Sequence, residues 1–168
     1  MSFVKRNPHS PTGFFACEAA GLRWLSAAVD GVPCAQVVAV DDAALTLERL
    51  AVGSPDRVAA EAFGARLAHT HDAGADGFGA APDSWTGPGF FGPLHQPLPM
   101  SYAAEASWGS FYAERRLRPM AERAALDSAT AEDVAAVMAE GEAMRATGAT
   151  AMNRRSSDAI ASVWPSGW

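Results

Sequence analysis

Residues 3–7 of the chain read Phe-Val-Lys-Arg-Asn, and residues 18–25 read Glu-Ala-Ala-Gly-Leu-Arg-Trp-Leu. The first stretch is typical of a short strand, and the second belongs to a predicted helix that runs to about Val29. One face of that helix collects the positions Glu18, Leu22, Leu25 and Val29. A carboxylate within an apolar stripe is costly unless a cation or a hydrogen-bond donor meets it. The pattern therefore allows a buried pair of Glu18 with Lys5, or a surface lysine and a half-exposed glutamate.

The composition predicts one soluble globular domain. Hydrophobic residues make up 49% of the 168 positions and charged residues 19%. With a formal net charge of -6 and a pI of about 5.1, the chain offers no basic face to nucleic acid or to an anionic membrane. The sequence shows no signal peptide and no apolar run of about 20 residues, so we expect a cytoplasmic protein. Cys17 and Cys34 lack metal or redox spacing and are expected to be free thiols.

The first fifty residues are expected to form a small sheet with one packed helix. Apolar and β-branched runs predict strands over residues 2–7, 36–40 and 44–48. Ser10 or Thr12 is the expected N-cap of the helix between the first two strands.

The following residues are expected to be mainly helical. Ser54-Pro55-Asp56 combines a capping residue, a proline and an acid, as is typical of a helix start. The helix that follows should present Ala59, Phe63 and Leu67 on one face and end near Gly74.

Glycine, proline and aromatic residues between positions 74 and 100 predict a long ordered loop or an irregular hairpin. A helix is expected over residues 105–126, with a kink or break at Pro119. Residues 130–133 resemble a capping box that starts one more helix. The residues expected on the inner faces of these two helices are Trp108, Phe111, Tyr112, Val134, Val137, Met138 and Gly141.

Several of these stretches resemble the fructosamine kinase (ketosamine kinase) family, which has a protein-kinase-like fold. The similarity covers roughly residues 3–125, and its motifs occur in the right order. They lie at residues 3–7, 18–25, 45–50, 63–71, 78–79, 89–96 and 108–119. The resemblance implies an α+β fold, an incomplete protein-kinase-like one. Its parts would be a partial N-lobe over 1–50, the start of the helical C-lobe over 51–145, and an atypical tail over 146–168.

The resemblance also implies roles for individual residues. Lys5 would contact the α- and β-phosphates of ATP, and Glu18 would hold Lys5. Adenine would bond to backbone groups around Glu48 and Leu50, in the hinge between the lobes. Complete members would use ATP and Mg²⁺ to phosphorylate a hydroxyl of a sugar attached to an amine, so the partners implied here are ATP and a glycated amine.

The sequence departs from the family in several places. Thr70 stands where an apolar residue is usual, and the asparagine expected shortly after Gln96 is absent. No glycine-rich loop precedes Lys5, and no His-Gly-Asp-Leu-Trp-Ser-Gly-Asn segment follows. We therefore expect a truncated or frameshifted copy with little or no turnover.

Two other functions stay open. His69, His71 and Asp72 resemble the start of a metallohydrolase site, although imidazoles two residues apart on a helix point about 200° apart. The chain could also be a non-catalytic remnant that binds nucleotide or a partner. In that case its exposed aromatic residues would form an apolar patch, namely Trp85, Phe90, Phe91 and Trp164.

Overall fold

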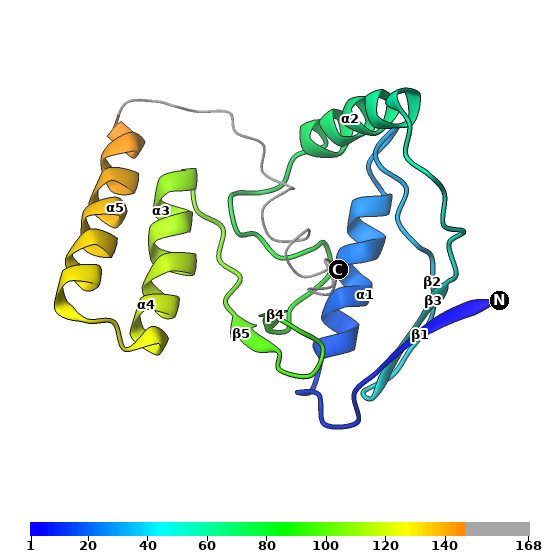
Figure 1. Cartoon of the computed structure of the whole chain (residues 1–168), viewed down its shortest axis with the longest axis horizontal. Helices are drawn as coiled ribbons and strands as arrows, with labels where there is room; N and C mark the ends of the chain where they lie inside the picture. Colours follow the sequence, from blue (N-terminus) through cyan, green and yellow to red (C-terminus); the bar gives the residue numbers. More distant parts are fainter. Residues whose placement is uncertain (147–168) are drawn as a thin grey trace.

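The computed structural model describes residues 1–146, with side chains described through Gly141. Within them, the chain alternates between short strands and helices before a final helical region (Figure 1). In chain order the elements are β1 (Ser2–Arg6), α1 (Phe14–Ser26), β2 (Val37–Val40), β3 (Ala44–Glu48), α2 (Arg57–Asp72), β4 (Gly89–Phe91), β5 (Leu98–Met100), α3 (Trp108–Tyr112), the π-helix η1 (Ala113–Leu117), α4 (Arg118–Ala124) and α5 (Ser128–Ala146).

The N-terminal sheet has three antiparallel strands in the order β1-β3-β2. Its register places Lys5 opposite Leu45 and Phe3 opposite Leu47. Helix α1 packs on the face to which Leu45 and Leu47 point, and both leucines are buried. The predicted small antiparallel sheet with a packed helix is confirmed.

Helix α1 lies between this sheet and the β4–β5 hairpin, so it is covered on both sides (Figure 1). Phe14 packs edge-to-face against Phe90, with ring centroids 5.6 Å apart. The core around α1 contains Phe14, Phe15, Cys17, Ala19, Leu22, Leu45, Leu47 and Phe90. Phe90 is therefore a core residue and Trp85 and Phe91 are half-buried, so the predicted apolar surface patch is wrong. Trp164 lies outside the described residues.

The start and end of α1 differ from the prediction. Gly13 is the N-cap, with φ of 83° and no side-chain cap, because glycine adopts this left-handed conformation without strain. The Ser10 hydroxyl instead donates to the carbonyl oxygen of Asp42 at 2.8 Å. The helix ends at Ser26, which leaves Val29 exposed beyond the buried stripe.

Helix α2 crosses the end of α1 and buries little of its surface (Figure 1). Its N-cap is Asp56, whose carboxylate accepts from the amide of Ala59 at 2.7 Å. Phe63 and Ala59 are exposed, so the predicted apolar face is not a core face within the described residues. Thr70 is the buried residue of α2, and its hydroxyl accepts from the amide of Val32 at 2.8 Å.

The last helices form an antiparallel pair, in which α3 and η1 pack against α5, and α4 leads into the turn before α5 (Figure 1). Gly109 on α3 meets Gly141 on α5, and a methyl group on Gly109 would collide with the carbonyl oxygen of Gly141. The π-helix η1 changes to the α-helix α4 at Arg118. At the predicted kink the helix therefore changes type, and Pro119 lies in the first turn of α4, where a proline is tolerated.

Helix α5 is capped differently from the prediction. Asp127 accepts from the amide of Thr130 at 3.0 Å and from its hydroxyl at 2.9 Å, so Thr130 is the donor and not the cap. Met138 is buried whereas Val137 is exposed. No helix within residues 1–146 has the length and hydrophobicity needed to cross a bilayer.

Candidate functional site

The structure brings Lys5 and Glu18 together. The β1–β3 register turns Lys5 to the face covered by α1, and α1 presents Glu18 from its central turns. Lys5 Nζ lies 2.6 Å from Glu18 Oε1, and their side chains are only 14% and 5% exposed. This geometry is a charge-assisted hydrogen bond inside the fold and not a surface contact.

Burial dominates the electrostatics of Glu18. Desolvation raises the pKa of its carboxyl above the ordinary value, and the charge and hydrogen bond of Lys5 oppose this shift only in part. A buried ion pair contributes little net stability, because both charges must leave water. Buried charges with shifted pKa values are therefore more common at functional sites than in ordinary cores.

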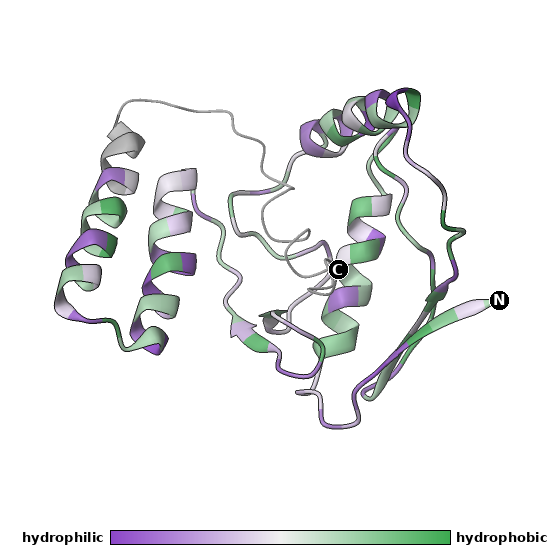
Figure 2. Ribbon diagram, viewed as in Figure 1, coloured by the Kyte–Doolittle hydropathy of each residue, from purple (hydrophilic) through white to green (hydrophobic). Residues whose placement is uncertain are grey.

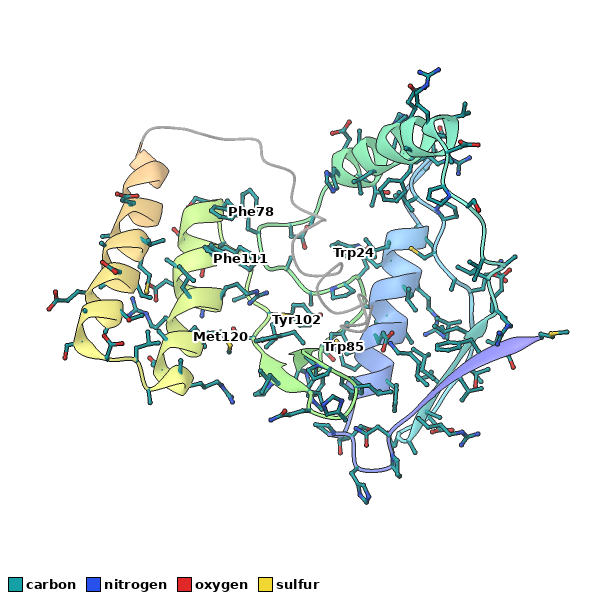
Figure 3. All side chains as sticks on the ribbon, viewed as in Figure 1. Trp24, Phe78, Trp85, Tyr102, Phe111 and Met120 are labelled. Carbon is teal, nitrogen blue, oxygen red and sulfur yellow. The ribbon has the colours of Figure 1, made fainter. Side chains whose placement is uncertain are left out.

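The neighbouring Cys17 is a buried thiol. Its Sγ lies 3.4 Å from the Tyr102 hydroxyl, and Tyr102 lies on the side of α1 that faces away from the sheet (Figure 3). Burial raises the pKa of the Cys17 thiol, which keeps the sulfur protonated and unreactive. Both Cys17 and Cys34 are free cysteines, as predicted.

The predicted hinge residues lie at the far end of the same sheet. Glu48 pairs with Ser2, three positions along the strand from Lys5, which corresponds to roughly 10 Å. The amide of Glu48 donates to the carbonyl oxygen of Gln36 at 2.8 Å. Leu50 follows β3 in an exposed segment, and 61% of its surface is accessible. Glu48 and Leu50 are therefore not in contact with the Lys5–Glu18 pair.

Asn7 holds the turn between β4 and β5 in place, a role that the sequence did not reveal. Its side-chain amide donates to the carbonyl oxygen of Leu94 at 2.7 Å, which fixes the turn between β4 and β5 beside the end of β1. The only indication in the sequence was an amide side chain at the end of the predicted strand, and such a side chain has many possible partners.

The histidines of α2 lie in its last turn. His69 is exposed and His71 is half-buried. Across the part of the chain that the structure describes, no group of three or more His, Cys, Asp or Glu residues is arranged to hold a metal ion. His69, His71 and Asp72 are therefore not part of such a group.

A hollow of about 460 Å³ lies on the outer side of α1. Ala16, Ala20 and Arg23 line it together with Trp85, and Figure 3 places Trp85 beside α1. Ala16 and Ala20 are each two residues from Glu18, so they point about 200° away from it. This hollow is separate from the Lys5–Glu18 pair.

The comparisons with known proteins identify the family. A family model described as fructosamine kinase matches residues 1–152. A crystal structure at 1.85 Å resolution of a candidate fructosamine-3-kinase from Thermobifida fusca YX-ER1 is similar, with a TM-score of 0.69 and 36% sequence identity. The match covers 90% of this chain and 51% of that chain, so the chain spans about half the length of its relative. No curated protein matches.

These similarities extend over most of the chain and include the β1–α1 region. They confirm the predicted α+β, protein-kinase-like fold and the predicted family. The chain belongs to the fructosamine kinase family.

Proposed function

We propose that the chain forms the nucleotide-binding part of a fructosamine kinase, in which Lys5 contacts the α- and β-phosphates of ATP and Glu18 holds Lys5 in place. The observation that carries this proposal is the buried 2.6 Å ion pair between strand β1 and helix α1. Kinase-like proteins use a strand lysine and a helix glutamate in this way. Burying these two charges costs desolvation energy, which a pair of apolar side chains at the same positions would not cost.

Adenine would lie beyond the end of β3. Because the Glu48 amide already donates to Gln36, backbone groups at Leu50 are the better partners for the base. The exposed Leu50 side chain would cover one face of the adenine ring. Residues 1–50 would then act as a partial N-lobe, and residues 51–145 as the start of the C-lobe.

The acceptor in complete members would be a hydroxyl of a sugar attached to an amine. Phosphoryl transfer needs a carboxylate that orients this hydroxyl and acids that hold Mg²⁺. The 168-residue sequence contains no His-Gly-Asp segment, and the described acids form no metal-binding group. We therefore propose that the isolated chain binds ATP and transfers little or no phosphate.

Thermal unfolding with and without MgATP tests nucleotide binding. At a concentration ten times Kd, ligand binding stabilises by about 1.4 kcal/mol, which corresponds to a rise in Tm of about 3–6 °C. Lys5→Met should abolish this rise relative to its own nucleotide-free Tm. Arg6→Met is the matched control, because Arg6 is exposed on the opposite face of β1 and should keep the rise.

An assay with ATP and a fructosyl-lysine peptide tests transfer. We expect no phosphorylation by the purified chain. Phosphorylation that depends on Lys5 would contradict the proposed inactivity while supporting nucleotide binding.

A further inference from the structure

The hollow on the outer side of α1 is made by elements from the interior of the chain: α1, the end of β2 and the turn of residues 82–85. Ala16, Ala20 and Arg23 recur on one face of α1, at i, i+4 and i+7. Because the two alanines are small, they leave space against the helix. The volume of about 460 Å³ is typical of a small-molecule site.

Trp85 forms an aromatic wall of this hollow and is held by two hydrogen bonds. Its amide donates to the carbonyl oxygen of Pro82 at 3.0 Å, and its indole Nε1 donates to that of Pro88 at 3.1 Å. The ring also lies beside the start of α1, since a methyl group on Gly13 would approach it to 3.5 Å (Figure 3). A ligand would therefore meet an indole that is already in position, which reduces the entropy cost of binding.

Two side chains of opposite charge line the same hollow, Arg23 on α1 and Asp83 in the turn before Trp85. Both are exposed, and among the residues that the structure describes neither side chain has an ion-pair or hydrogen-bond partner. Figure 2 shows hydrophobic colour along most of α1, interrupted by hydrophilic bands. The hollow therefore combines an apolar surface with one free positive and one free negative group.

We propose that this hollow binds a free α-amino acid with a large apolar side chain. Arg23 would pair with the carboxylate, Asp83 with the ammonium group, and the side chain would pack on Trp85. A simple anion fits less well, because Asp83 would repel it. The interior of a peptide also fits less well, because its backbone carries neither charge.

This inference is independent of the proposed nucleotide binding. Helix α1 separates the hollow from the Lys5–Glu18 pair, because Ala16 and Ala20 point about 200° away from Glu18. The amino acid and MgATP should therefore bind without competing.

An NMR titration with phenylalanine tests the proposal. The indole N–H resonance of Trp85, identified by its loss in Trp85→Phe, should shift with a Kd of roughly 0.1–1 mM. N-acetylphenylalanine lacks the ammonium group and phenylalaninamide lacks the carboxylate, and each should bind about tenfold more weakly. Glycine, which has no side chain to pack on the indole, should also bind more weakly.

Variants of the two charged residues assign each contact. Arg23→Met and Asp83→Asn should each raise the Kd for phenylalanine about tenfold. Arg23→Met should in addition bind phenylalanine and phenylalaninamide equally, because the partner of the carboxylate is gone. Arg66→Met, which removes an exposed cation from α2, is the matched control and should leave the Kd unchanged. Lys5→Met and added MgATP should also leave it unchanged.

The proposal is overturned if the Trp85 resonance does not shift at ~10 mM phenylalanine. It is also overturned if the wild-type chain binds phenylalanine and its two derivatives equally, or if both charge variants keep the wild-type Kd. Circular dichroism establishes that each variant is folded. A Kd that rises in Lys5→Met would place the amino acid at the proposed nucleotide site instead.

Discussion

Glu18 is a carboxylate that the fold holds in its core beside one lysine. Because its pKa is raised by burial, the folded chain binds a proton at Glu18 more readily than the unfolded chain does. The number of bound protons is then larger in the folded state over the pH range above 4.5, the ordinary value for this group. Stability from this group therefore falls as the pH rises through that range.

Comparison of the wild-type chain with Glu18→Gln measures this effect. We expect the wild-type free energy of unfolding, relative to that of the variant, to increase as the pH falls from 7 toward about 4.5. Urea denaturation at several pH values gives the difference. A difference that decreases toward low pH would contradict the assigned direction.

Thr70 makes a specific bond at a position where the family usually has an apolar residue. Thr70→Val removes the acceptor for the Val32 amide and should lower the free energy of unfolding by about 1–3 kcal/mol, because a part-buried donor loses its partner. Thr70→Ser keeps the hydroxyl and should lose much less. Equal losses for both substitutions in urea denaturation would show that the hydrogen bond is not the cause.

At the scale of elements, the repeating patterns of the sequence predict where a helix or strand lies better than where it begins and ends. Alternation and apolar runs located β1, β2 and β3, and the helical stripe located α1. The predicted N-caps were wrong. Gly13 begins α1 because the Ser10 hydroxyl bonds to Asp42 instead, and Asp127 accepts from Thr130 at the start of α5. Ala59, Phe63 and Leu67 do share one face of α2, but periodicity does not show whether a partner covers that face.

The crossing of α3 and α5 depends on a contact between two glycines. Gly109→Ala should lower the free energy of unfolding by about 1–3 kcal/mol, because the methyl group collides with the backbone at Gly141. Gly64→Ala, in the open middle of α2, should instead raise it by about 0.5–1 kcal/mol, because alanine favours the helix. Thermal or urea unfolding gives both values. A neutral Gly109→Ala would mean that α5 shifts to accommodate the methyl group.

At the scale of the whole molecule, contacts between distant residues could not be predicted. The Asn7–Leu94 bond joins residues 87 positions apart, and Cys17 meets Tyr102 across 85 positions. Nothing local in the sequence indicates either pair. The pattern alone left the Lys5–Glu18 pair as one of two alternatives, and the resemblance to the family favoured it; the structure forms the pair. Whether Glu48 and Leu50 bind adenine stays a prediction.

Phe111 joins the helical pair to the rest of the molecule. Its side chain is almost fully buried, a methyl group on Gly79 would lie 2.6 Å from its ring, and the Arg116 guanidinium lies 4.5 Å above the ring. Figure 3 places Phe111 on the side of α3 that faces the loop and sheet. Phe111→Ala should therefore cost about 3–5 kcal/mol and loosen the helical pair from that loop.

The hydrophobic core that supports β1, α1 and β3 does not include Phe111. The rise in Tm with MgATP should therefore persist in Phe111→Ala even though the nucleotide-free Tm falls. Phe15→Ala removes a ring from the core shared by α1 and β3, and it should lower the Tm and abolish the rise together. Loss of the nucleotide effect in Phe111→Ala, at a temperature where circular dichroism still shows folded protein, would place part of the binding site on the helical pair. If the rise in Tm persists in Phe111→Ala and is lost in Phe15→Ala, nucleotide binding lies in the β1–α1–β3 unit.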